Sequence, residues 1–371
     1  MLVITNRKFR KHRNRDTYSL KDAFNPRGPE ELRLFWATPR TGDEVEKWDL
    51  RLVPDRPRLK EFSGLDTSFI PAGQGRRFGS DLATAKLLAR IAENKRDVLL
   101  FIHGYNTNVH DALARAHRIE TSYPVEVVVF SWPSNGGGDN PLEDAHGVAS
   151  YLLDKADARK SIAALDRALW RMHALITGLN AGLFDTARTH ARQIAPDDRD
   201  EQRREIARWL REHRCPFNVT LLAHSMGNYL YKKLLTSSSE RLSCDCTFDN
   251  VVLKAADTNH EDHADWVARI RARQRVYILI NQNDHALKLS SLKVGEAQKA
   301  RLGATLAEQN AANASYIDLT EALGDEHSYF DRTDLETPFP ELEPLMEKLV
   351  TGRNAHAGLG YRVDTNTFVP Q

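Results

Sequence analysis

Residues 219–227 read Val-Thr-Leu-Leu-Ala-His-Ser-Met-Gly, and they give the strongest indication of the fold. An apolar strand runs into Ser225, and the apolar positions that follow, such as Leu230 and Leu234, have helical spacing. A serine at a sharp strand-to-helix turn projects its Oγ above a sheet, and the residues two before and two after it must be small. Ala223 and Gly227 meet that demand. The stretch therefore predicts a nucleophile elbow with Ser225 as the nucleophile.

The rest of the chain alternates short apolar runs with helical patterns. Near-continuous apolar runs are typical of strands that are covered on both faces, and strands that alternate with helices form parallel sheets. The sequence therefore predicts an α/β-hydrolase fold, a mostly parallel central sheet flanked by helices. Besides the strand before Ser225, the predicted strands are 98–102, 125–130, 251–253, 276–280 and 316–319.

Three regions depart from this rhythm. Strand-like pieces at 2–5, 32–37 and 48–53 predict antiparallel N-terminal edge strands. Residues 136–200 separate two sheet strands by more than one crossover helix and predict an inserted helical cap, so that the core is 1–135 and 201–350. The polar segment 351–371 is expected to be loosely ordered.

Composition excludes several classes of function. The 371 residues carry 52 Lys and Arg against 51 Asp and Glu. This near balance of charge does not favour binding to nucleic acid, and no nucleic-acid partner is expected. No apolar run reaches the length of a transmembrane segment, and the N-terminal run is too short for a signal peptide. Three cysteines, Cys215, Cys244 and Cys246, do not suggest a disulfide framework or a metal site. We expect a cytoplasmic protein without a metal or organic cofactor.

A nucleophilic serine needs a base and an acid that orients the base, and in this fold they follow it in the order Ser, Asp or Glu, His. Asp284 directly follows the 276–280 strand, and His327 follows the last predicted strand. We therefore predict a Ser225, Asp284 and His327 triad. Asp257 also follows a strand and stays open as an alternative acid.

The oxyanion of such a reaction needs two preorganised donors. One is expected to be the backbone N–H of Met226, at the helix N-terminus. The second is expected to be the N–H of Tyr105, because Gly104 lets the loop after strand 98–102 approach the site. The substrate pocket is predicted to be lined by His103, Gly104, Trp132 and His224. The alternatives are that Trp132 is an ordinary core aromatic and His224 a packing histidine.

The motifs resemble a bacterial α/β-hydrolase family of unknown function. The likeness lies in five segments outside the predicted cap and tail: 98–106, 130–134, 222–228, 283–287 and 327–330. The resemblance implies the hydrolase fold and the same triad, and it supplies no substrate.

The sequence thus predicts a serine hydrolase that cleaves a carboxylester, lipid acyl or thioester bond through an acyl-enzyme. Its expected partner is a small-molecule or lipid ester. The alternative is a hydrolase-like scaffold that binds an anionic partner, because residues 7–15 hold six Lys and Arg.

Overall fold

The computed structural model describes residues 1–40, 48–70, 75–134, 148–213, 217–237, 247–292, 299–331, 334–335 and 339–370. Its centre is a 13-stranded sheet with the order β12-β13-β11-β10-β9-β8-β6-β7-β1-β4-β5-β3-β2. The strands are β1 (Leu2–Thr5), β2 (Arg7–Lys11), β3 (Tyr18–Phe24), β4 (Arg33–Pro39), β5 (Trp48–Leu52), β6 (Asp97–Ile102), β7 (Val125–Ser131), β8 (Val219–His224), β9 (Phe248–Lys254), β10 (Ala272–Ile280), β11 (Ala314–Asp318), β12 (Gly360–Arg362) and β13 (Thr367–Val369).

The strands from β1 through β7, β6, β8, β9, β10 and β11 to β13 pair in parallel. Every residue of β7, β8 and β9 is buried, as continuous apolar runs predict for a sheet covered on both faces. The predicted mostly parallel central sheet is thereby confirmed. Because the strands are parallel, their carboxyl ends meet at one edge of the sheet.

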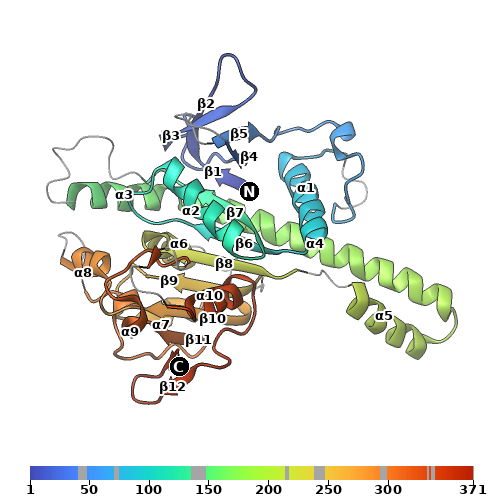
Figure 1. Cartoon of the computed structure of the whole chain (residues 1–371). Helices are drawn as coiled ribbons and strands as arrows, with labels where there is room; N and C mark the ends of the chain where they lie inside the picture. The colour runs from blue at the N-terminus through green and yellow to red at the C-terminus, as the bar shows by residue number, and fades with distance from the viewer. Residues whose placement is uncertain are drawn as a thin grey trace.

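The helices are α1 (Gly79–Asn94), α2 (Val109–Ser122), α3 (Val148–Lys160), α4 (Ile162–Ile194), α5 (Arg199–His213), α6 (Met226–Ser237), α7 (His263–Val267), α8 (His285–Leu292), α9 (Thr320–Leu323) and α10 (Leu342–Val350), with 3-10 turns η1 (Leu59–Phe62) and η2 (Leu302–Ala304). One apolar cluster packs α1, α3, α4, α6 and α7 on one face of the sheet, and a second packs α2, α9 and α10 on the other. Figure 1 shows α2 and α10 in front of the sheet and α4 behind it. Within the described residues, no helix is both long and apolar enough to span a membrane.

The N-terminal strands are not all edge strands. β1 pairs in parallel with β7 and antiparallel with β4, so it lies inside the sheet. Only β4, β5, β3 and β2 form the antiparallel extension. All four residues of β1 are buried and apolar or β-branched, which suits an interior strand.

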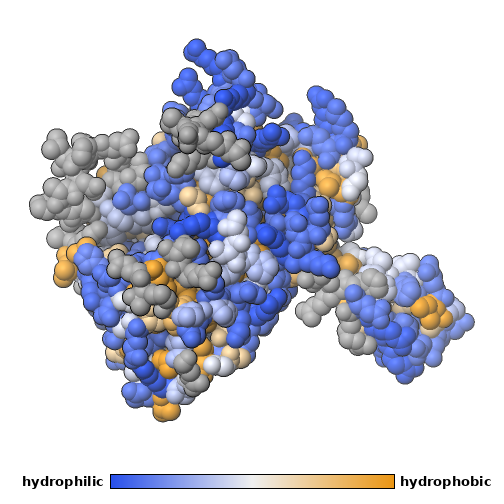
Figure 2. Space-filling model, in the orientation of Figure 1, coloured by the Kyte–Doolittle hydropathy of each residue, from blue (hydrophilic) through white to orange (hydrophobic). Residues whose placement is uncertain are grey.

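The described part of the predicted cap is α3 and α4. The 33-residue helix α4 crosses the sheet face and then runs beyond it, where α5 packs against it (Figure 1). The visible surface of this hairpin is mostly hydrophilic (Figure 2). This part of the chain therefore reaches away from the sheet as well as over it. The glycines at its start, 136–138, lie outside the described residues.

The C-terminal tail joins the sheet. β12 and β13 form a hairpin, and Phe368 of β13 pairs with Ile317 of β11. Asn366 turns the hairpin in the left-handed region, at φ 52°, and Phe368 stacks on His356 at 4.8 Å. Polar and aromatic residues alternate around this turn, which is a strand pattern. The segment is polar overall, so this pattern is easily overlooked in the sequence.

Arg7, the first cation of the basic stretch, is fully buried. Its guanidinium pairs with Asp22 and donates to Ser131 Oγ at 3.0 Å and to the carbonyl oxygen of Thr107 at 3.1 Å. Burial lowers the pKa of Arg7 to about 10, so it remains charged at neutral pH. It therefore ties the N-terminal strands to the end of β7 and to the loop after β6.

Arg7→Met is expected to lower the free energy of unfolding by roughly 2–4 kcal/mol, because it removes three hydrogen bonds and leaves Asp22 unpaired. Arg10→Met, at an exposed position of the same strand, is the matched control and should change it by less than about 0.5 kcal/mol. Urea denaturation of both variants measures the difference. Equal urea midpoints for the two variants would show that the buried contacts of Arg7 do not stabilise the fold.

Candidate active site

Ser225 lies between β8 and α6 with φ at 53°, the left-handed region that non-glycine residues rarely adopt. Its N–H donates to the carbonyl oxygen of Lys254 on the neighbouring strand at 3.1 Å. The Asn228 amide donates to the carbonyl oxygens of Ala223, Ser225 and Lys254 at 3.0–3.1 Å. The strained turn is thus held by bonds on both sides.

Two glycines let the backbone close around Ser225. A Cβ on Gly227 would lie 2.6 Å from the carbonyl oxygen of Ile102 on β6. A Cβ on Gly104 would lie 2.7 Å from Ser225 Cβ and 3.2 Å from its Oγ. The loop after β6 therefore passes directly against the Ser225 side chain, which is the approach that the predicted oxyanion loop requires.

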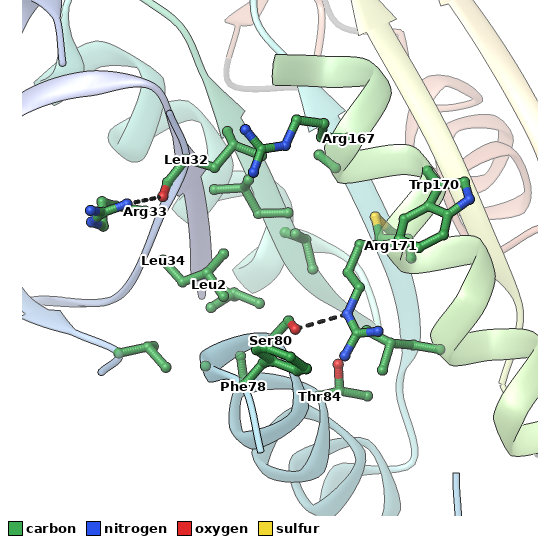
Figure 3. Close-up of a pocket in the computed structure, with 18 of the residues that line it drawn as sticks. Leu2, Leu32, Arg33, Leu34, Phe78, Ser80, Thr84, Arg167, Trp170 and Arg171 are labelled. Atoms are coloured by element: carbon green, nitrogen blue, oxygen red, sulfur yellow. Dashed lines mark hydrogen bonds between the residues drawn. The ribbon is translucent and has the colours of Figure 1, made fainter. Parts of the chain in front are cut away.

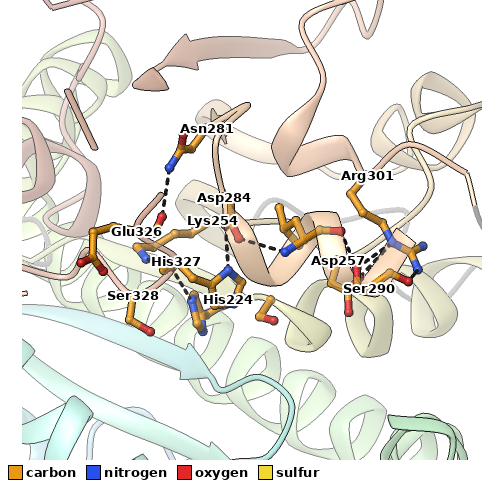
Figure 4. Close-up of polar contacts among 12 residues, drawn as sticks. His224, Lys254, Asp257, Asn281, Asp284, Ser290, Arg301, Glu326, His327 and Ser328 are labelled. Atoms are coloured by element: carbon orange, nitrogen blue, oxygen red, sulfur yellow. Dashed lines mark hydrogen bonds and ion pairs between the residues drawn. The ribbon is translucent and has the colours of Figure 1, made fainter. Parts of the chain in front are cut away.

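His327 and Asp284 meet at the same edge of the sheet (Figure 4). The distance from His327 Nδ1 to Asp284 Oδ2 is 2.7 Å. The Asp284 carboxylate is fully buried, and its Oδ1 accepts from the N–H of Leu287 at 2.9 Å. The Asn281 amide donates to the carbonyl oxygens of Gly324 and Glu326, which fixes the loop that leads to His327.

Asp257, the alternative acid, is engaged elsewhere. Its carboxylate accepts from Tyr151 at 3.0 Å and from Ser290 at 2.8 Å, and it pairs with Arg301 at 3.1 Å. All four side chains are buried, and Figure 4 shows Asp257, Ser290 and Arg301 apart from His327. Tyr151 belongs to α3 and Ser290 to α8, so the cluster joins α3 to the helix that follows Asp284.

Of the two predicted oxyanion donors, Met226 directly follows Ser225, and Tyr105 directly follows Gly104, which approaches the Ser225 side chain. Met226 is the first residue of α6, where backbone N–H groups are available to an anion. The Tyr105 hydroxyl lies 2.7 Å from Ser150 Oγ of α3. The Asp154 carboxylate accepts from the N–H of Asn106 and from the Ser134 hydroxyl, both at 2.9 Å. Helix α3 thus supports the loop that carries Tyr105.

His103 and Trp132 directly follow β6 and β7 and are buried in the core next to the candidate site. Both are fully buried, and their rings stack at 5.5 Å. The backbone N–H of Trp132 donates to His103 Nε2 at 3.2 Å, so the ring proton is on Nδ1, which faces the carbonyl oxygen of Gly104 at 3.1 Å. Burial, reinforced by the charge of Arg7, lowers the pKa of His103 well below its usual value. This neutral histidine ties the loop after β6 to the end of β7.

His224 is buried beneath His327 rather than open to solvent, with ring centroids 4.9 Å apart. Lys254, which the sequence reasoning did not single out, is also fully buried, and its Nζ lies 3.4 Å from the carbonyl oxygen of His327. Asp154 was missed as well. A lysine that ends an apolar strand was the available signal for Lys254. No local signal marks Asp154, because its partners are about 20 and 48 residues distant.

A cavity of about 650 Å³ lies between α1, α4 and the β1 and β4 strands (Figure 3). Its wall is mostly apolar, and Arg167 and Arg171 lie at its edge. Arg171 donates to Ser80 and pairs with Asp81. None of the predicted site residues lines this cavity.

In the described part of the chain, no group of three or more His, Cys, Asp and Glu side chains is arranged to hold a metal ion. His260 and His263, which lie close together in sequence, are both buried, and His263 contacts the Tyr316 hydroxyl at 2.7 Å. Cys215, Cys244 and Cys246 lie outside the described residues.

Comparison with known proteins places the chain in a protein family. The model of the family described as an alpha/beta hydrolase of unknown function, DUF900, matches residues 80–176 and 192–330. These ranges hold Gly104, Ser225, Asp284 and His327. No curated protein and no solved structure matches the chain significantly. The match covers more than half of the sequence, and the chain belongs to this family of α/β-hydrolases of unknown function.

Proposed function

We propose that the protein is a serine hydrolase that cleaves an ester-type bond through an acyl-enzyme. The observation that carries the proposal is the 2.7 Å contact between His327 Nδ1 and Asp284 Oδ2, at the sheet edge where Ser225 occupies its strained turn. A nucleophile, a base and a carboxylate that orients the base are the parts that acyl transfer to serine requires.

The proposed reaction has two halves. Ser225 Oγ attacks the ester carbonyl while His327 Nε2 takes its proton, and the backbone N–H groups of Met226 and Tyr105 bind the oxyanion. His327 returns the proton to the leaving alcohol or thiol, which departs as the acyl-enzyme forms. Water then attacks the acyl-enzyme, again giving its proton to His327, and the acid is released with Ser225 restored. Asp284 fixes the imidazole so that Nδ1 keeps its proton and Nε2 faces the reaction.

An apolar acyl group is the substrate feature that the surface favours. Leu152 and Leu153 of α3 and Leu289 and Leu292 of α8 are 38–79% exposed. The Asp257 cluster joins these two helices, and Figure 2 shows hydrophobic surface at the position of α8. Helix α3 contacts the Tyr105 hydroxyl through Ser150, and α8 begins directly after Asp284. Exposed apolar side chains on these two helices are suited to an acyl chain or a lipid surface.

Ser225→Ala is expected to remove nearly all hydrolysis of p-nitrophenyl esters, because the variant has no nucleophile. Only the small rate enhancement from substrate binding and the oxyanion site would remain. The predicted loss in kcat is at least about 10³-fold. A series of esters from acetate to palmitate, measured with both proteins, tests the reaction and the chain preference together. Equal activity of the two proteins would end the proposal, and a preference for acetate would remove the lipase and phospholipase interpretations.

The acid is tested by a matched pair of substitutions. Asp284→Asn should lower kcat by about 10²–10⁴-fold with little change in protein stability, because His327 loses its orienting carboxylate. Asp257→Asn should lower the melting temperature, because the buried Arg301 loses the negative charge that faces it, while kcat of the folded protein stays within about tenfold. The reverse pattern, measured as kcat beside circular dichroism, would assign the acid to Asp257.

The cytoplasmic location and the absence of a nucleic-acid partner stay predictions from the sequence. No contact in the described residues favours the alternative role as a scaffold for an anionic partner. Of the six cations in residues 7–15, Arg7 is buried, and Lys11 pairs with Asp16 at 2.9 Å.

A further inference from the structure

The carbonyl oxygen of His327 receives two basic side chains from different strands. His224 Nε2, at the end of β8, lies 3.2 Å from it. Lys254 Nζ, at the end of β9, lies 3.4 Å from it. A carbonyl oxygen has two lone pairs and can only accept, so both nitrogens donate to it. Figure 4 shows the two side chains converging on the His327 segment.

The orientation of His224 follows from this contact. Because Nε2 donates, the ring proton of a neutral His224 is on Nε2. Burial, with the nearby charges of Lys254 and His327, lowers the pKa of His224 well below its usual value, so the ring is neutral at neutral pH. Its ring also contacts Phe330, with centroids 4.9 Å apart. His224 is therefore fixed as a single-donor contact to the His327 main chain.

Lys254 lies in an aromatic enclosure. Its Nζ is 3.5 Å from the ring centroid of Tyr329 and 4.0 Å from that of Phe330. An ammonium over aromatic faces is stabilised most strongly where water is excluded. Burial and the charge of Arg115 lower the pKa of Lys254, and acidic groups on the neighbouring loops oppose that shift. These groups are Asp334, Asp284 and Glu326.

Lys254 also contacts the nucleophile through its main chain. Its carbonyl oxygen accepts from the N–H of Ser225 at 3.1 Å and from the Asn228 amide at 3.0 Å. One residue thus binds the main chain of Ser225 through its carbonyl oxygen and the main chain of His327 through its side chain. His224 adds a second link, because it directly precedes Ser225. These contacts set the relative position of two groups that are 102 residues apart in the sequence.

We propose that Lys254 and His224 are positioning residues, which hold the main chain of His327 in place relative to Ser225. The proposal rests on the proposed function and names residues outside the Ser225, Asp284 and His327 triad. His327 follows α9 on a loop, and a displacement of about 1 Å in a reacting group costs up to about 10²-fold in rate. We call the two side chains and the His327 carbonyl oxygen the His327 clamp.

Two pairs of variants separate donation from packing. Lys254→Met and His224→Phe keep the bulk and remove the donor, whereas Lys254→Gln and His224→Gln keep an N–H donor. The first pair should lower kcat for ester hydrolysis by about 10- to 100-fold with KM unchanged within about twofold. The second pair should recover part of that loss. Lys233→Met is the matched control, because it removes a lysine 5.4 Å from the Tyr229 ring on α6 and should leave kcat unchanged.

A spectroscopic measurement tests the clamp without a substrate. The proton between His327 Nδ1 and Asp284 should give a low-field proton resonance that is absent in His327→Ala. The resonance should broaden or vanish in Lys254→Met and in His224→Phe and persist in Lys233→Met, because a displaced imidazole exchanges this proton with water. Should Lys254→Met not fold, His224→Phe carries the test.

The outcomes distinguish the two proposals. An unchanged resonance and wild-type kcat in both donor-free variants would overturn the clamp while leaving the hydrolase intact. A wild-type protein without hydrolysis dependent on Ser225 would overturn the proposed function. In that case, loss of the resonance in the donor-free variants would still support the clamp.

Discussion

The backbone of Ser225 is the constraint on which the rest of this structure depends. A φ of 53° costs free energy for a residue with a side chain, on the order of 1 kcal/mol or more. The turn persists because neighbouring elements hold it. The Asn228 amide binds three carbonyl oxygens around it, and Gly104 and Gly227 let β6 and its loop approach. Substituting either glycine would push the loop or the helix away from the serine.

Buried basic groups surround this turn and are bonded rather than solvated. His103 is neutral, with both ring nitrogens in contact with backbone groups, and His224 and Lys254 both reach the His327 carbonyl oxygen. Their pKa values are lowered chiefly by burial. Buried polar groups stabilise a unique geometry only where their hydrogen-bond partners are present. These contacts make the edge of the sheet a rigid frame for the loops that carry the proposed chemistry.

Local patterns predicted much of this arrangement. Continuous apolar runs located the parallel strands, and small residues around Ser225 located the turn. Chain order suggested Asp284 and His327, which the structure brings within 2.7 Å. These features depend on neighbours in sequence or on the general plan of the fold.

The features that sequence reasoning missed depend on contacts between distant segments. Lys254 resembles an ordinary strand end until its side chain meets the rings of Tyr329 and Phe330, about 75 residues later. Asp154 gains its role only when α3 packs against the loop after β6. The tail looked loosely ordered because its polarity conceals a hairpin whose partner, β11, is about 50 residues earlier. The interior place of β1 follows from pairing with β7, which no local pattern specifies.

We propose that Ser225 is an activated nucleophile, and covalent labelling of the folded protein tests this directly. Folded protein is treated with a fluorophosphonate probe, and peptide mass spectrometry locates the adduct. We predict one adduct per chain, on Ser225, which is absent after unfolding in urea and absent in Ser225→Ala. A folded wild-type protein that stays unlabelled, or an adduct on another residue that persists in Ser225→Ala, would contradict the claim.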